Sequence, residues 1–224
     1  MQNDFATTAT IKALGMEDDS ELEKINLYTL RPVTKEEVFT CKVLACSNEV
    51  DRDLECFSQE ALQELAELYK GRSVIFDHTA STKNQVARIY DAKVVVDSTK
   101  KTKTGADYAT LILYLFIPRI EKTKDLISEI EMGIKKEVSV ACCVGKRACT
   151  ICGKDAWCCE HKPGEEYDGA FCAAELSEVK DAYELSFVAV PAQKDAGTQK
   201  NANKNPKQEK KTTVLDGFKK FLQI

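Results

Sequence analysis

The spacing of cysteines between residues 142 and 172 constrains the fold of this chain more than any other sequence feature, since seven of the ten cysteines lie there. Cys149 and Cys152 are separated by two residues, and Cys159 is followed two positions later by His161. Two thiols at the first spacing can grip one metal ion from a tight turn, and a Cys₃His set suits tetrahedral zinc. The sequence therefore predicts one metal site formed by these four side chains.

The predicted zinc site has a structural rather than a catalytic character. Four protein ligands leave no open position for water, and the polar insertion at residues 146–172 has little core of its own. Cys158 competes with Cys159 for the third position. We favour Cys159 because a Cys-x-His pair places both ligands on one side of an extended segment, and we assign Cys172 no ligand role.

Composition and charge indicate a soluble globular protein. Of the 224 residues, 43% are hydrophobic and 30% are charged, and no apolar run is long enough to span a bilayer. The first residues lack a secretory pattern, so we expect a cytoplasmic protein whose cysteines are thiols or metal ligands, not disulfides.

Charge is divided unevenly along the chain. Residues 193–224 hold eight Lys and three acidic residues, a net charge of +5, whereas the whole chain carries −4. We expect an N-terminal arm at 1–33, a main domain at 34–192, and a basic flexible tail at 193–224 that ends in a short amphipathic helix. The tail fits either a solvated linker or a contact with nucleic acid or an acidic protein.

Hydrophobic periodicity predicts a mixed fold with more strand than helix. We expect strands at 37–46, 73–77, 86–96, 108–117, 137–144 and 182–190, and helices at 59–69 and 118–132. Ser58 is a good N-cap for the first helix and Gly71 a good stop. This order favours an α+β fold, mainly an antiparallel β-barrel with surrounding helices.

Hydrolytic chemistry at neutral pH has few candidate bases in this sequence. Only two histidines are present, and one of them belongs to the cysteine cluster, which leaves His78 at the end of a predicted strand. A serine nucleophile needs such a base, and the base needs a third group to fix its tautomer.

Four segments, in order, resemble the caudoviral prohead maturation protease family. They are residues 48–61, the strand at 74–78 with 85–89, the segment Lys-Glu-Val-Ser-Val at 136–140, and Tyr-Glu-Leu-Ser-Phe-Val-Ala-Val-Pro-Ala at 183–192. The last is similar to the family's Glu-x-Ser-x-Val-x-x-Pro-Ala strand. The resemblance spans about residues 36–197.

The resemblance implies a herpesvirus-assemblin-like β-barrel with a catalytic triad. It carries over His78 as the base and Ser139 as the nucleophile, and we assign Glu184, which opens the last motif, as the third member. Asp77 is an alternative acid, although a residue adjacent to His78 on a strand points to the opposite face.

The residues after Ser139 depart from the family pattern, which usually has a small residue and then an aromatic one. Here two thiols, Cys142 and Cys143, follow closely and offer a rival nucleophile. Arg88 is a candidate for electrostatic assistance near the nucleophile or a solvated strand residue.

The implied function is a serine endopeptidase that trims scaffold and major capsid precursor proteins, and possibly itself, inside the assembling phage prohead in the host bacterial cytoplasm. We expect an oligomer within the prohead, no membrane contact and no nucleic-acid substrate. Two alternatives remain at this level: a catalytically inactive head-assembly or scaffolding protein of the same fold, and a zinc-knuckle nucleic-acid-binding protein.

Overall fold

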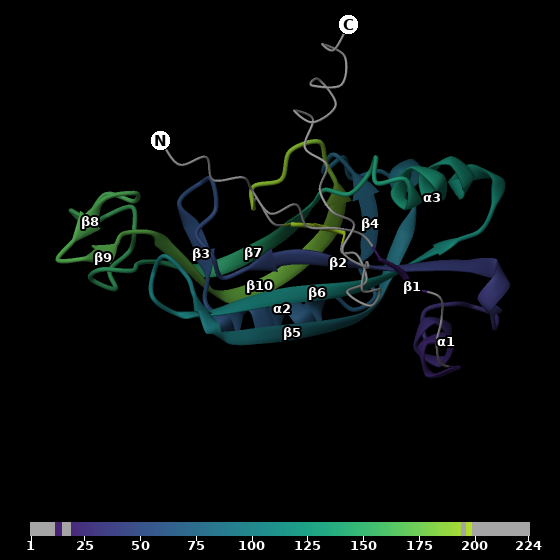
Figure 1. Cartoon of the computed structure of the whole chain (residues 1–224), viewed down its shortest axis with the longest axis horizontal. Helices are drawn as coiled ribbons and strands as arrows, with labels where there is room; N and C mark the ends of the chain where they lie inside the picture. The colour runs from purple at the N-terminus through teal and green to yellow at the C-terminus, as the bar shows by residue number, and fades with distance from the viewer. Residues whose placement is uncertain (1–11, 15–18, 194–195, 199–224) are drawn as a thin grey trace, which may run out of the picture.

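A computed structural model describes residues 12–14, 19–193 and 196–198 of the chain. The described chain is an α+β protein dominated by one nine-stranded, mostly antiparallel sheet (Figure 1). Its strands are β1 (Lys12–Leu14), β2 (Val38–Ser47), β3 (Glu55–Phe57), β4 (Ser73–Phe76), β5 (Ala87–Lys101), β6 (Asp107–Pro118), β7 (Val138–Cys149), β10 (Ala174–Phe187) and β11 (Gly197–Thr198). A separate pair, β8 (Glu166–Tyr167) and β9 (Ala170–Phe171), lies in the cysteine-rich insertion.

The sheet runs in the order β1-β2-β6-β5-β4-β10-β3, with β7 also paired to β10 and β11 to β2. Most pairs are antiparallel, but β10 runs parallel to both β3 and β4. The expected closed barrel is not formed by the described strands. β2 and β7 are not paired with each other, and only an isolated bridge from Gly197 to Glu137 connects β11 to the segment before β7.

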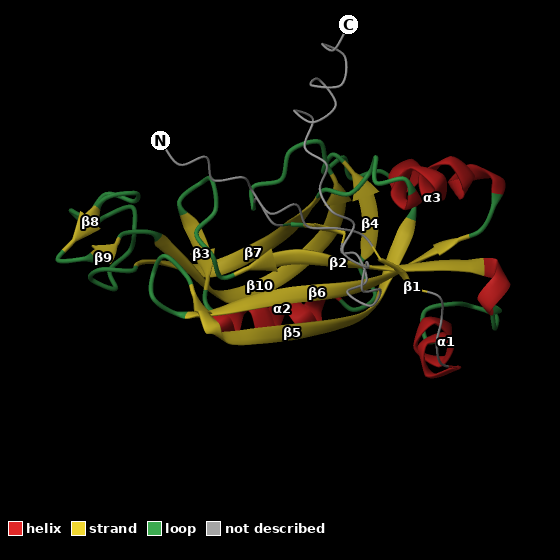
Figure 2. Cartoon of the chain, in the orientation of Figure 1, coloured by secondary structure: helices red, strands yellow, loops and turns green. Residues whose placement is uncertain are grey.

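One helix fills the concave side of the curved sheet. α2 (Gln59–Tyr69) packs against β5, β6 and β10, as Figure 2 shows. Leu62 and Leu65 on its inner face are fully buried, in the same cluster as Leu113 and Leu115 of β6. Burial of such side chains stabilises the fold by about 1.5–3 kcal/mol each, so the helix and sheet form one core.

The first predicted helix has the limits that its sequence signals indicate. Ser58 is the N-cap, and its hydroxyl accepts a hydrogen bond from the Ala61 N–H at 3.0 Å. Gly71 follows the helix with a φ of +81°, a conformation that glycine adopts without steric cost.

The second predicted helix begins later than expected. Residues 118–132 were expected to be helical, but Pro118 ends β6, where it pairs with Val38. A 3₁₀ turn, η3 (Glu121–Thr123), then leads into α3 (Lys124–Glu131). Ile127 and Ile130 face inward as predicted, whereas Ile120 is 54% exposed. Pairing with Val38 keeps the chain extended as far as Pro118, and a proline is tolerated there because the last residue of a strand can lack a ladder donor.

The N-terminal region contains more regular structure than its weak periodicity suggested. α1 (Asp19–Asn26) buries Ile25 completely in a small second cluster with Val38, Tyr90 and Phe116. Two further 3₁₀ turns, η1 (Lys35–Glu37) and η2 (Thr82–Asn84), complete the elements. None of the described helices has the length and apolarity to cross a bilayer.

The main fold continues past residue 192, where the sequence analysis placed the start of the tail. Gln193 is buried, and its side chain forms hydrogen bonds with the backbone N–H and C=O of Ser47. The predicted helix near the C-terminus, at residues 214–222, lies outside the described residues.

The N-cap of α2 gives the first testable prediction. Ser58→Ala removes the acceptor for the Ala61 N–H, and we expect the free energy of unfolding to fall by about 1 kcal/mol. Urea denaturation measures the loss. Ser58→Asp, which keeps an acceptor at the cap, should lose much less, and equal losses in both variants would contradict a capping role.

Candidate active site and metal centre

The central position of β10 brings the predicted active-site segments side by side. Ser139 of β7 pairs with Ser186 on one side of β10, and Ile75 of β4 pairs with Ser186 on the other. His78 follows two residues after the end of β4. Since neighbouring strands lie about 4.8 Å apart, the backbones of β7 and β4 are separated by about 10 Å at this level. Serine and histidine side chains can extend toward each other over such a gap.

His78 and Glu184 are in direct contact. Nδ1 of the imidazole lies 2.7 Å from Oε1 of Glu184, although the two residues are 106 positions apart in the chain. The Glu184 side chain is 12% exposed and the His78 side chain 43% exposed. A carboxylate at Nδ1 holds the proton on that nitrogen and leaves Nε2 as the free base. The structure thus places Glu184, and not the alternative acid Asp77, at the imidazole.

The turn that carries His78 has an unusual backbone. Asp77 and His78 have φ values of +50° and +52°, in the left-handed region that non-glycine residues rarely adopt. The Asp77 N–H donates to the Phe187 carbonyl at 3.0 Å, and the Thr79 N–H donates to the Phe76 carbonyl at 2.9 Å. Strain of this kind persists only where the surroundings fix it, and it is concentrated at functional sites.

A β-bulge at Tyr183 sets the direction of the Glu184 side chain. Ala182 and Leu185 are both fully buried although they are three positions apart, because the pairing with β7 shifts between Ala182 and Glu184. Tyr69 at the end of α2 stabilises this point, since its hydroxyl contacts the carbonyls of Ala141 and Glu184 at 3.0 and 3.3 Å. The core helix is therefore tied directly to both site strands.

Ser139 lies on the same face of the sheet as Ser186, because residues directly opposite each other in an antiparallel pair share a face. Among the residues that the structure describes, no hydrogen bond joins the Ser139 hydroxyl to the imidazole. Ser139 lines a cavity of about 480 Å³ that follows the unpaired edge of β7 as far as Arg147 and is bounded by Gln193 and Ala196. A second hollow of about 330 Å³ lies beside Asp77 and Glu137.

The thiols near Ser139 are poorly suited to replace it. Burial raises the pKa of Cys142 to about 11, and this side chain packs against the main core. The Cys143 thiol is engaged by the hydroxyl of Tyr183. Arg88 is also committed elsewhere, because its guanidinium donates to the Gly71 carbonyl at 2.7 Å.

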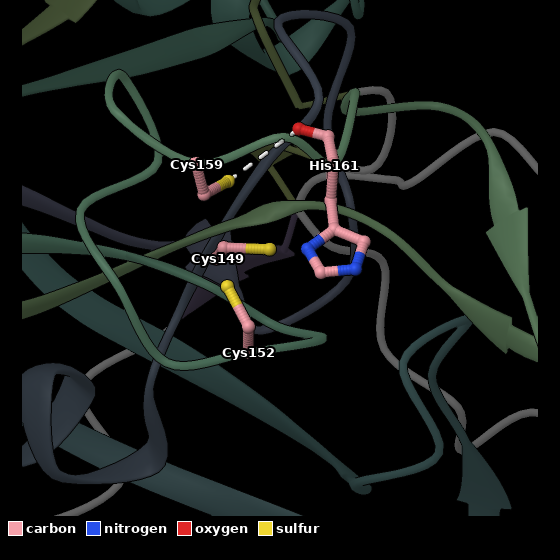
Figure 3. A group of neighbouring side chains, drawn as sticks. All are labelled: Cys149, Cys152, Cys159 and His161. Atoms are coloured by element: carbon pink, nitrogen blue, oxygen red, sulfur yellow. Dashed lines mark hydrogen bonds between the residues drawn. The ribbon is translucent and has the colours of Figure 1, made fainter.

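The cysteine-rich insertion brings together the four predicted metal ligands. The ligand atoms of Cys149, Cys152, Cys159 and His161 all lie within 4.8 Å of one another. Figure 3 shows the three sulfur atoms and the imidazole grouped together. Cys158, the alternative third ligand, is exposed and does not belong to this group. The four side chains can hold a metal ion.

Two features of the cluster fit a bound cation. Nδ1 of His161 is buried without a hydrogen-bond partner in the described structure, and a metal would satisfy it. Burial alone would raise the pKa of the Cys149 thiol, but the backbone N–H groups of Cys152 and Ile151 outweigh it and lower the value to about 6. A sulfur held as a thiolate by backbone donors is the form that binds metal.

Neighbouring residues hold the ligands in place. The ring of Tyr167 meets the His161 ring edge-on at 4.6 Å, and its hydroxyl accepts a hydrogen bond from the Lys162 N–H. Cys172, to which the sequence analysis gave no role, lies with its sulfur 3.8 Å from that of Cys149, and burial raises its pKa to about 12. Cys172 therefore lies beside the four-residue group without belonging to it.

The Cys/His cluster and the Ser139–Ser186 pair lie at opposite ends of the ladder between β7 and β10. Cys149 ends β7 and pairs with Ala174 at the start of β10, and the insertion projects from this end in Figure 1. Ten residues of β7 separate Cys149 from Ser139, a distance of about 30 Å along a strand. The insertion reaches the long cavity only through its base, at Arg147.

Comparisons of the chain with protein-family models, with curated proteins and with solved structures find no match.

The metal centre is testable with the purified protein. We expect one equivalent of zinc per chain by elemental analysis, and cobalt substitution should give thiolate-to-cobalt absorption bands. Cys152→Ser should lower metal occupancy at least several-fold, because one of four ligands is lost. Cys158→Ser is the matched control and should keep full occupancy; a loss there equal to that of Cys152→Ser would assign the ligand set differently.

Proposed function

We propose that this protein is a serine endopeptidase of phage prohead maturation, with Ser139, His78 and Glu184 as its catalytic residues. The observation that carries the proposal is the 2.7 Å contact between His78 Nδ1 and Glu184 Oε1, with Glu184 on strand β10, which pairs with the β7 strand that holds Ser139. An acid, a base and a serine in this arrangement suit acyl transfer.

The proposed reaction follows the usual two steps of serine proteases. The Ser139 oxygen attacks the carbonyl carbon of the scissile bond while His78 Nε2 accepts the hydroxyl proton, and Glu184 stabilises the imidazolium. The same nitrogen then donates the proton to the departing amine, which breaks the C–N bond and leaves an acyl-enzyme. Water, deprotonated by Nε2, hydrolyses the ester and regenerates Ser139.

The resemblance supports the assignment of substrate and place. Scaffold and major capsid precursor proteins, and possibly this chain itself, are the proposed substrates, and the interior of the assembling prohead in the bacterial cytoplasm is the proposed location. The open edge of β7 beside Ser139 lines a cavity of about 480 Å³, which is the proposed binding place for a peptide segment. The mainly antiparallel sheet with packed helices agrees with the α+β class that the resemblance implies, although the described strands do not close into the implied barrel. An oligomer within the prohead belongs to the same proposal.

We further propose that Cys149, Cys152, Cys159 and His161 bind a structural zinc ion. All four ligands come from the protein, so the metal would fix the polar insertion without taking part in hydrolysis. Its role would be to hold the loop that connects β7 to β10, at the end remote from the catalytic residues.

A catalytically inactive head-assembly protein of the same fold is the main rival. The observation in its favour is that no hydrogen bond joins Ser139 to His78 in the described structure. Catalytic hydrogen bonds are often long in enzymes without substrate and shorten in the complex, so an unformed Ser139–His78 hydrogen bond is also expected of an active protease without substrate.

A zinc-knuckle nucleic-acid-binding function has less support. Arg147 and Trp157, the side chains of the insertion best suited to phosphate and base contacts, are already engaged. The guanidinium lies 4.4 Å from the centre of the Trp157 ring and also pairs with Glu55 of β3. These contacts favour a structural role for Arg147, whereas Trp157 is 75% exposed.

The protease function can be tested by intact mass after incubation of the purified protein, alone and with its cognate scaffold. We expect wild-type protein to cleave the scaffold and Ser139→Ala to lose at least about 10³-fold in rate, since the nucleophile is removed. Glu184→Gln should also lose on the order of 10³-fold or more, because the carboxylate no longer supports the imidazolium.

Cys142→Ala provides the matched control for the rival thiol nucleophile and should retain cleavage. Loss of activity in Cys142→Ala together with its retention in Ser139→Ala would reassign the nucleophile. No cleavage by wild-type protein under assembly conditions would favour the inactive assembly protein.

Metal removal should act on the insertion and not on the catalytic end of the sheet. After chelation we expect faster amide hydrogen exchange at residues 150–172, because this loop has little core to hold it, with unchanged protection of β10 from Leu185 to Phe187. Mass-spectrometric exchange measures both regions. Equal loss of protection in both would mean that the metal supports the whole sheet.

A further inference from the structure

Ser186 is a fully buried serine whose hydroxyl joins the two residues of the His78–Glu184 pair. The hydroxyl accepts a hydrogen bond from the backbone N–H of His78 at 2.9 Å and donates one to Oε2 of Glu184 at 2.7 Å. Its proton and one of its lone pairs are thus committed within the site. Because the proton is committed and the side chain has no access to solvent, Ser186 is not a competing nucleophile.

The first effect of this hydroxyl is on the carboxylate. Glu184 and Ser186 lie two positions apart on β10 and share one face of the sheet. Oε2 of Glu184 binds Ser186 while Oε1 binds His78, so the carboxylate is held on both oxygens. Without Ser186 the carboxylate could rotate about its side-chain bonds, and Oε1 would no longer be fixed opposite Nδ1.

The second effect is on the backbone of the base. Asp77 and His78 adopt left-handed conformations that persist only where the surroundings hold them. The His78 N–H points at Ser186, so the hydroxyl fixes the residue from which the imidazole projects. Ser186 therefore orients both partners of a long-range contact. Its hydroxyl donates a hydrogen bond to the Glu184 carboxylate and accepts one from the His78 backbone N–H.

We propose that Ser186 is a positioning residue of the active site, which uses one hydroxyl to align the Glu184 carboxylate with the His78 imidazole. This inference rests on the proposed protease function for its effect on rate. The alignment itself is a property of the folded protein and can be measured without activity. The sequence signal for it is the Glu-x-Ser spacing at 184 and 186, which places both side chains on one face of a strand.

The kinetic test compares Ser186→Ala with Ser177→Ala, a matched control on the same strand but remote from the site. We expect Ser186→Ala to lower kcat for scaffold cleavage by on the order of 10²-fold with little change in KM, because misalignment affects the chemical step more than substrate binding. Ser177→Ala should match wild type. Retention of wild-type kcat in Ser186→Ala would overturn the proposal.

A spectroscopic test separates this proposal from the protease function. In Ser139→Ala protein with ¹⁵N-labelled histidine, the Nδ1-bound proton of His78 should give a low-field resonance, assigned by its absence in His78→Gln. We expect Ser186→Ala to remove or shift that resonance and Ser177→Ala to leave it. If wild-type protein cleaves nothing yet the resonance depends on Ser186, the protease function fails and the positioning role stands. An unchanged resonance in Ser186→Ala overturns the positioning role.

Two further variants guard against a simple packing defect. Ser186→Cys has a similar volume but a weak donor and acceptor, so it should lower kcat and remove or shift the resonance, as expected for Ser186→Ala. It takes the place of the alanine variant if that variant does not fold. Ser186→Thr keeps the hydroxyl and should restore the resonance and most of kcat. A cysteine variant indistinguishable from wild type would contradict a hydrogen-bonding role.

Discussion

The antiparallel pairing of β7 with β10 is the interaction on which both candidate sites depend. At one end of this pair Ser139 lies opposite Ser186, and at the other Cys149 lies opposite Ala174, next to the cysteine-rich insertion. The backbone hydrogen bonds between the two strands fix their register from Ser139 to Cys149, apart from two bulges. The two strands therefore hold the nucleophile candidate, the acid and the metal ligand in a fixed relation, whatever the loop between them does.

The parallel pairing of β4 with β10 adds the base to this frame. It directs the end of β4 toward the face that carries Glu184 and Ser186, and the left-handed turn at Asp77 and His78 then brings the imidazole onto the carboxylate. The energetic cost of the strained turn is offset by its hydrogen bonds to β10 and by the core beneath it. In that core the Tyr69 hydroxyl of α2 donates hydrogen bonds to the carbonyls of Ala141 and Glu184. Local strain at the site is thus supported by packing elsewhere.

Much of the fold could be predicted from local patterns. The run of strand-forming residues at 37–46, the Ser58 cap and the Gly71 stop depend on nearby residues only, and all three agree with the structure to within a residue. The closed barrel and the helix start at Pro118 were wrong, because both depend on which strand lies beside which. The α1 helix was missed because Ile25 is buried by contacts with Val38, Tyr90 and Phe116, which are distant in sequence.

The sequence by itself determined which residues are candidates for metal binding or catalysis. They are the Cys-x-x-Cys and Cys-x-His spacings, the single histidine outside that cluster, and the serine and glutamate of two strand motifs. These signals are local, since they depend on residue type and short spacing. Only the tertiary structure decided that Glu184 and not Asp77 meets His78, that Cys159 and not Cys158 joins the metal cluster, and that Ser186 connects acid to base. Each of these choices depends on a β-bulge, a turn or a strand pairing between segments far apart in the chain, and no local pattern specifies such contacts.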